Sequence, residues 1–122
     1  MNNRFDTKVS INKKELLNCI DRATLLIKDG DKKPIVISIN DSNMELKMQS
    51  TVGSMNEDIE IKKEGNDIVI GFNPKFLIDV LKVIDDELID IYLVNSKSPC
   101  FIKNEEGTYI YLVLPVNIKV VN

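Results

Sequence analysis

The chain has 122 residues, of which 43% are hydrophobic and 29% charged, which is enough apolar material for one compact core but not for two. Its 16 Lys and Arg residues are outnumbered by 19 Asp and Glu residues, so the formal net charge is -3. This balance excludes a strongly basic nucleic-acid-binding domain, and any role on DNA must depend on where individual cations lie.

Composition also predicts a cytoplasmic location. The chain lacks a run of about 20 apolar residues, the length that a membrane helix needs, and residues 1–8 are polar, unlike a secretory signal. Cys19 and Cys100 are far apart in sequence and lie in apolar periodic segments. We therefore expect two buried free thiols in preference to a disulfide.

The first half of the chain predicts a strand, a helix and three further strands. Residues 7–11 alternate as a strand does, and Asn12 is placed to cap a helix, with Glu15 completing a capping box and Gly30 as the stop signal. Strands are predicted over residues 34–40, 43–49 and 55–63, with a turn at residues 40–43.

The same order then repeats after a turn at Gly65 and Asn66. Residues 67–72 predict a strand, and Asn73 and Pro74 begin a helix that should run to about Asp86. Strands follow over residues 88–94, 98–103 and 108–114, the last two joined by a turn at residues 104–107. Two helices and eight strands in two similar halves predict an α+β fold, with a helix pair packed on antiparallel sheets and approximate twofold symmetry.

Both predicted helices are amphipathic. Their buried faces are expected to contain Leu16, Ile20, Ala23 and Ile27 in the first helix and Leu77, Val80, Leu81 and Ile84 in the second. Their polar faces carry the cations Lys13, Lys14, Arg22, Lys28, Lys75 and Lys82 together with Asp21, Asp29, Asp79 and Asp86. Such a face is either a solvated surface or a loose track for a phosphate backbone, and spacing alone favours the solvated surface.

Two apolar features allow a structural and a functional interpretation. Leu25 projects into the polar face of the first helix, beside Leu26, either as an ordinary surface leucine or as part of an interface. Residues 109–116 are hydrophobic on both faces. They form either a strand covered on both sides or a strand whose end borders a groove for a partner peptide.

Residues for catalysis are scarce. The chain has no His, no Cys-x-x-Cys pair, no glycine-rich phosphate loop and no G-x-S-x-G motif, so an enzyme is disfavoured and no cofactor is expected. Asp85, Asp86 and Glu87 offer oxygen ligands for a hard cation, but an acidic run after a helix is more often a solvated turn. A hydrolase built on this acidic cluster is the weakest of the functions considered.

Four segments of the chain are informative in combination: residues 71–81 (GFNPKFLIDVL), 98–100 (SPC), 111–116 (YLVLPV) and 22–26 (RATLL). Together they resemble the third, C-terminal domain of bacterial DNA sliding clamps, the beta subunits of DNA polymerase III holoenzyme. The similarity extends from about Thr7 to Ile118, with the order and spacing of that domain. The resemblance implies the DNA clamp fold, with residues 1–122 as a single domain of a three-domain subunit.

In that family two subunits form a homodimeric ring that encloses duplex DNA without sequence preference and holds the polymerase on it. The resemblance therefore implies a non-catalytic processivity factor, part of a DNA-directed DNA polymerase (transferase) complex. The residues implied to face DNA are Lys14, Arg22, Lys75 and Lys82. The residues implied at the subunit junction are Leu25 and Leu26.

The family also has a pocket for a short motif, often glutamine followed by leucines and phenylalanine, carried by the polymerase, the clamp loader and repair proteins. The matching wall positions here are Asn73, Phe76, Lys97, Pro99, Leu112, Val113, Leu114, Pro115 and Val116. Phe76 stands where the family often has tyrosine, Asn117 stands where many relatives have arginine, and residues 119–122 extend past the usual end. Part of the family's pocket comes from the preceding domain. The alternative is an unrelated α+β protein-interaction module with no role on DNA.

Overall fold

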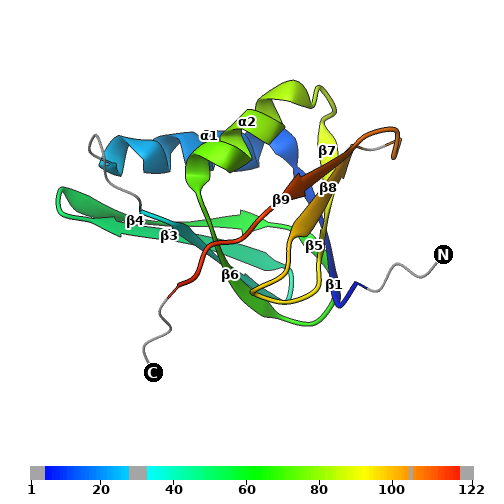
Figure 1. Cartoon of the computed structure of the whole chain (residues 1–122), viewed down its shortest axis with the longest axis horizontal. Helices are drawn as coiled ribbons and strands as arrows, with labels where there is room; N and C mark the ends of the chain where they lie inside the picture. Colours follow the sequence, from blue (N-terminus) through cyan, green and yellow to red (C-terminus); the bar gives the residue numbers. More distant parts are fainter. Residues whose placement is uncertain (1–4, 28–32, 105, 119–122) are drawn as a thin grey trace.

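The computed structural model describes residues 5–27, 33–104 and 106–118 of the chain. The strand, helix and three-strand order occurs twice, as predicted (Figure 1). In chain order the elements are β1 (Thr7–Asn12), α1 (Lys13–Ala23), a 3-10 turn (Thr24–Leu26), β2 (Ile35–Asn40), β3 (Asn43–Ser50), β4 (Gly53–Glu60), β5 (Lys62–Gly65), β6 (Ile68–Phe72), α2 (Pro74–Val83), β7 (Leu88–Leu93), β8 (Cys100–Asn104) and β9 (Ile110–Val113).

The two halves exchange their first strands. Sheet A has the order β5-β1-β7-β8-β9, so the first strand of the first half lies beside the three strands of the second half. Sheet B has the order β4-β3-β2-β6, which is the reciprocal arrangement. The registers are antiparallel, with Val9 opposite Ile91 in sheet A and Ile37 opposite Ile70 in sheet B. This exchange gives the approximate internal twofold relation, and each sheet contains strands from both halves.

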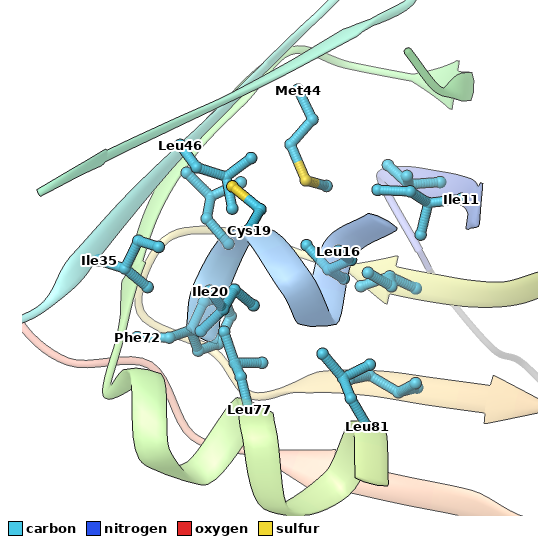
Figure 2. Packing of buried hydrophobic residues seen from close by; sticks show 14 of the residues in the cluster. Ile11, Leu16, Cys19, Ile20, Ile35, Met44, Leu46, Phe72, Leu77 and Leu81 are labelled. Atoms are coloured by element: carbon cyan, nitrogen blue, oxygen red, sulfur yellow. The ribbon is translucent and has the colours of Figure 1, made fainter. Parts of the chain in front are cut away.

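Both helices pack against each other on one side of the two sheets (Figure 1). Leu16 and Ile20 of α1 and Leu77 and Leu81 of α2 are buried between the helices and the sheets. Figure 2 shows these side chains meeting others from the strands, which include Ile11, Ile35, Met44, Leu46 and Phe72. The helices are thus held by their apolar faces, which leaves their polar faces toward solvent.

The start of α1 confirms half of the predicted capping box. The backbone N–H of Glu15 donates to Asn12 Oδ1 at 2.9 Å. Among the described residues, no bond from the Asn12 amide to the Glu15 carboxylate is found. Asn12 is also the last residue of β1, where it pairs with Leu88, so its backbone belongs to the sheet.

Both helices end earlier than predicted. The α-helix of α1 ends at Ala23 and tightens into the 3-10 turn, where the Thr24 hydroxyl donates to Asp21 O at 2.6 Å; the predicted stop at Gly30 lies outside the described residues. α2 ends at Val83 and not at Asp86, because Ile84 is extended. In that conformation the Ile84 side chain enters the core at the entrance to β7.

The predicted count of eight strands is also wrong, because the single strand expected over residues 55–63 is two strands. β4 ends at Glu60 in sheet B, and β5 begins at Lys62 in sheet A. Between them Ile61 is buried, and its N–H donates to Ser42 O at 2.9 Å. This single residue carries the chain from one sheet to the other. Within the described residues no helix has the length and apolar character needed to cross a membrane.

Candidate functional site

The four cations expected to face DNA are all exposed on the two helices. Lys14 and Arg22 lie on α1, whereas Lys75 and Lys82 lie on α2. α1 and α2 pack against each other on one side of the molecule (Figure 1). Asp21 and Asp79 are exposed on the same helices, and Lys28 and Asp29 lie outside the described residues. The helix surface therefore carries mixed charge.

Arg22 differs from the three lysines because it is held by a carboxylate. Its Nε donates to Glu57 Oε2 at 2.9 Å, and its terminal nitrogen bonds the other carboxylate oxygen, so the pair is bidentate between α1 and β4. Hydrogen bonds from Arg22 lower the pKa of Glu57, and the same bonds raise the pKa of Arg22. A phosphate would have to compete with Glu57 for this guanidinium.

Cys19 lies beneath this pair, and Cys100 lies in β8. Both are free and buried, as predicted. Burial, with a smaller effect from nearby Glu57, raises the pKa of Cys19 to about 11. Burial raises the pKa of Cys100 to about 12. Both thiols are therefore protonated at neutral pH and serve as small apolar core groups.

The leucines expected at a subunit junction have different environments. Leu25 is 81% exposed in the 3-10 turn after α1, so its side chain projects into solvent. Leu26 is half-buried and packs against the core, and its Cδ2 approaches the β3–β4 turn at Gly53. Any contact with another chain at this end therefore depends mainly on Leu25, while Leu26 anchors the turn that presents it.

The predicted pocket residues lie at the start of α2, in the turn before β8, on β9 and in the segment after β9. We call this the β9–α2 surface; it comprises Asn73, Phe76, Lys97, Pro99, Leu112, Val113, Leu114, Pro115 and Val116. β9 contacts α2. Past β9 the chain reaches β6, where the Val116 N–H donates to Gly71 O at 2.9 Å. That bond holds residues 114–116 beside the start of α2.

Local hydrogen bonds fix the polar edges of this surface. Asn73 caps α2, and its Oδ1 accepts from the Lys75 N–H at 3.0 Å. Asn95 Oδ1 accepts from the N–H groups of Lys97 and Ser98, each at 2.8 Å, which closes the turn before β8. Since Cys100 pairs with Val113, extension of the register places Pro99 near Leu114. The polar edges of the surface are thus the N-terminus of α2 and the turn before β8.

Side chains along β9 and the residue after it point alternately to the core and to solvent, and only those facing solvent can contact a partner. Val113 is 3% exposed, so its side chain belongs to the core and its contribution to a wall is limited to its backbone. Leu112 and Leu114 are 57% and 61% exposed on the opposite face. Phe76 of α2 is 57% exposed, and Pro115 and Val116 are half-buried. The surface thus presents three large apolar side chains to solvent, as a binding site for an apolar peptide requires.

Two residues near these sites, Ile110 and Glu57, were absent from the sequence-based predictions. Ile110 is 58% exposed on the same face of β9 as Leu112, and the period-2 alternation of the strand contains this information. Glu57, the partner of Arg22, is 35 residues away in sequence. Its position across from α1 follows from packing of the helix on sheet B, which no local pattern indicates.

The acidic run after α2 lies beside the start of α1. Asp85, Asp86 and Glu87 line a groove of about 630 Å³ together with Lys13 and Lys14. The Lys13 N–H donates to Glu87 O at 2.9 Å. In the part of the chain that the structure describes, no three Asp, Glu, Cys or His side chains are grouped so as to hold a metal ion.

Comparison with known proteins identifies one family. The family model described as "DNA polymerase III beta subunit, C-terminal domain" matches residues 2–117. The beta sliding clamp of Staphylococcus aureus is 30% identical over 115 residues, which is 92% of this chain but 30% of that protein. The chain thus spans about a third of the length of such relatives.

Solved structures give the same result. A structure from Eubacterium rectale, described as a DNA polymerase III beta subunit, is 67% identical with a TM-score of 0.91, and the match covers 93% of this chain and 31% of the other. The DNA polymerase III beta subunit of Thermotoga maritima is 36% identical with a TM-score of 0.90, covering 98% of this chain and 33% of the other. The fold is therefore that of these proteins: duplicated, α+β, with two helices on antiparallel sheets.

Proposed function

Because the chain belongs to the family of the DNA polymerase III beta subunit, as its C-terminal domain, we propose that it is one domain of a sliding clamp. In this proposal residues 1–122 are the third domain of a three-domain subunit, and two subunits close a ring around duplex DNA in the cytoplasm. The ring keeps the replicative polymerase on its template. Membership of the family argues against the alternative of an unrelated interaction module.

The helix surface supports contact with DNA that is loose and independent of sequence. Lys14, Lys75 and Lys82 are long, exposed cations that reach phosphates without reading bases. The exposed Asp21 and Asp79 among them weaken the attraction, and Arg22 is already bound to Glu57. Weak, non-specific attraction suits a ring that must slide.

The subunit junction in this proposal lies at Leu25. The Leu25 side chain is 81% exposed at the end of a helix, and its burial against a second chain would remove apolar surface from water and so lower the free energy. β4 is the edge strand of sheet B, and η1, the 3-10 turn that carries Leu25, contacts its neighbour β3. The edge strand and Leu25 therefore offer one continuous area for a homodimer contact.

The β9–α2 surface supports binding of a short peptide from the polymerase, the clamp loader or repair proteins. The observation that carries this proposal is the exposure of Phe76, Leu112 and Leu114 on adjoining elements. A motif of glutamine, leucines and phenylalanine would place its apolar side chains against them, with the Asn73 amide and nearby backbone groups available to orient it. The role of the chain is therefore to tether partners, without catalysis.

A titration of the 15N-labelled chain with a peptide that contains the glutamine-leucine-phenylalanine motif tests this proposal. We expect the amide resonances of Phe76 and Val113 to shift, and a scrambled peptide to leave them unchanged. Binding will be weak, because the isolated chain has only one side of the family's pocket. Leu114→Ser is expected to lower the affinity about tenfold, which is the usual effect of removing one well-packed apolar contact.

Leu88→Ser is the matched control. Leu88 is an exposed leucine at the start of β7, remote from the β9–α2 surface, so its replacement should leave peptide affinity unchanged. Equal loss of affinity in the two variants, or a scrambled peptide that binds as well as the motif, would argue against this surface as the binding site.

A further inference from the structure

A row of paired side chains crosses the solvent-facing side of sheet A and ends at the proposed peptide site. Each member lies opposite the next on the neighbouring strand. We call it the outer row; from β1 to β9 its members are Lys8, Tyr92, Phe101 and Leu112. Directly paired residues point to the same face of a sheet, and their chain neighbours Val9 and Ile102 are buried on the other face. The outer row therefore faces solvent.

Phe5 adds a third aromatic ring to this row and packs against the rings of Tyr92 and Phe101. Its ring centroid is 4.4 Å from that of Tyr92, with the planes tilted by 46°, and 6.0 Å from that of Phe101, edge to face. All three rings are half-buried against one another, while Leu112 at the end of the row is 57% exposed. The result is a continuous apolar strip that leads from Phe5 to the β9–α2 surface.

Two lysines lie over the rings of this strip. Lys103 Nζ is 4.7 Å from the centroid of Tyr92 and 6.0 Å from that of Phe5, and Lys8 Nζ is 5.8 Å from Tyr92. Both distances to Tyr92 are within the range of cation–π attraction. These contacts hold the ammonium groups close to the apolar surface, where they are partly shielded from water.

The two lysines differ in the carboxylates around them. Lys8 Nζ is 3.7 Å from Glu64 Oε2. Among the described residues no carboxylate is within ion-pair distance of Lys103; its cross-strand neighbour Asp90 instead accepts a hydrogen bond from the Ser10 hydroxyl at 2.7 Å. Lys103 is therefore the cation of this strip that is best placed to bind a carboxylate from a partner.

We propose that the outer row is an extension of the peptide site, which takes an acidic residue next to an aromatic or leucine side chain in the segment flanking a clamp-binding motif. The inference rests on the proposed function, since Leu112 belongs to both surfaces. The acidic group pairs with Lys103, and the neighbouring apolar side chain packs on Phe101 and Leu112. Charge complementarity at this position selects among partners that share the same core motif.

The structure favours a peptide over single-stranded nucleic acid at this strip. Stacking of a base needs an open ring face, and the rings of Tyr92 and Phe5 are covered by each other and by Lys103. The net charge of -3 adds no general attraction for phosphates. A carboxylate, in contrast, reaches the free side of Lys103 without displacing any ring.

The test compares three peptides on the 15N-labelled chain: the core motif, and the core motif extended by Glu-Phe at either end. We expect one extended peptide to bind about fivefold more tightly than the core, the gain that one partly shielded ion pair and an apolar contact provide. The extended peptide should also shift the amide resonances of Tyr92 and Phe101, which the core peptide should leave unchanged. Lys103→Glu should abolish the gain without affecting the core peptide.

Lys62→Glu is the matched control, because Lys62 is on the same face of sheet A, on β5, and the substitution changes the net charge equally. The gain should survive in that variant. The outer-row proposal alone is wrong if the core peptide shifts the amide resonances of Phe76 and Val113 but neither extended peptide binds more tightly or shifts the resonance of Tyr92. If the core peptide shifts nothing, the pocket proposal falls. Shifts of Tyr92 and Phe101 caused by oligothymidine but not by the extended peptides would overturn the assignment to a peptide.

Discussion

At the scale of single residues, neighbours in sequence have opposite tasks in this protein. Leu25 projects into solvent while Leu26 anchors its turn, and Val113 fills the core while Leu112 and Leu114 remain exposed. Each exposed member depends on the buried one, because the buried side chain fixes the backbone that presents it. Substitution of Leu26 or Val113 would therefore report on stability, and substitution of Leu25 or Leu114 would report on binding.

Gly65 is the residue whose replacement should be the most damaging in the turns. Its φ is +100°, and a Cβ there would be 2.0 Å from the carbonyl oxygen of Asp6. We expect Gly65→Ala to lower the free energy of unfolding by about 3 kcal/mol, from backbone strain and steric clash together. Gly107, with a φ of +70° and open space around it, is the control, and Gly107→Ala should cost about 1 kcal/mol. Urea denaturation of both variants measures the difference, and equal losses would contradict the role of the clash.

Both cysteines should resist modification in the folded chain. Burial raises the pKa of Cys19 to about 11 and that of Cys100 to about 12, so at pH 8 almost no thiolate is present and neither sulfur is accessible. We expect no reaction with a disulfide reagent such as DTNB during the time that free glutathione reacts completely. Both thiols should react once guanidinium unfolds the chain. Rapid reaction of one thiol in the native protein would show that its surroundings open.

At the scale of elements, the Arg22–Glu57 pair connects α1 to β4. Hydrogen bonds from Arg22 lower the pKa of Glu57. A carboxyl whose folded-state pKa is below its unfolded value stabilises the fold above the unfolded value, and this contribution is lost as pH falls through the folded value. Glu57→Gln should therefore lower the free energy of unfolding at pH 7, by less than Gly65→Ala because the pair is exposed.

The pH dependence distinguishes this pair from general charge effects. The difference in the free energy of unfolding between the wild-type chain and Glu57→Gln should shrink below about pH 4, where the wild-type carboxylate begins to be protonated. Glu60→Gln, at an exposed position on the same strand, serves as the control, and its free energy of unfolding should differ little from that of the wild-type chain at pH 7 and at pH 3. Thermal denaturation across this pH range makes the comparison, and a constant difference between pH 7 and pH 3 would rule out the ion pair as its cause.

At the scale of the whole molecule, the exchange of first strands makes one folding unit of two repeated halves. Because β1 completes sheet A and β6 completes sheet B, separation of the halves would break both sheets. The same fold brings α1 and α2 together on one side of the molecule (Figure 1). The fold thus presents the helix surface on one side, Leu25 after α1 and the β9–α2 surface at the edge of sheet A.

Binding of duplex DNA to this helix surface should be weak and strongly dependent on salt. If Lys14, Lys75 and Lys82 each neutralise one phosphate, affinity should fall about 40-fold between 50 and 200 mM salt. Fluorescence anisotropy with a labelled duplex, or amide shifts of these three residues, measures this dependence. The affinity should not change with base sequence. Binding that is insensitive to salt, or that prefers one sequence, would contradict a role in sliding.

Except at residues 55–63, local patterns in the sequence were sufficient for the order of helices and strands, the repeat, the polar and apolar faces of the helices and the caps at Asn12 and Asn73. Each of these features depends on residues a few positions apart. The same patterns, with the resemblance of residues 71–81 and 111–116, predicted which segments form the proposed peptide site. The alternation of β9 also contained the distinction between Val113 and its exposed neighbours.

Tertiary packing alone decided the features that depend on distant contacts. α2 ends before Ile84, because the side chain of this residue is buried in the core with its backbone extended. The predicted strand over residues 55–63 divides at Ile61, which is buried where the chain passes from sheet B to sheet A. The strand exchange places β1 beside β7, and the outer row begins with the pairing of Lys8 and Tyr92 on these two strands. Arg22 and Glu57 are 35 positions apart in sequence. Such contacts arise from burial and pairing free energy summed over the whole molecule, which no local window of sequence contains.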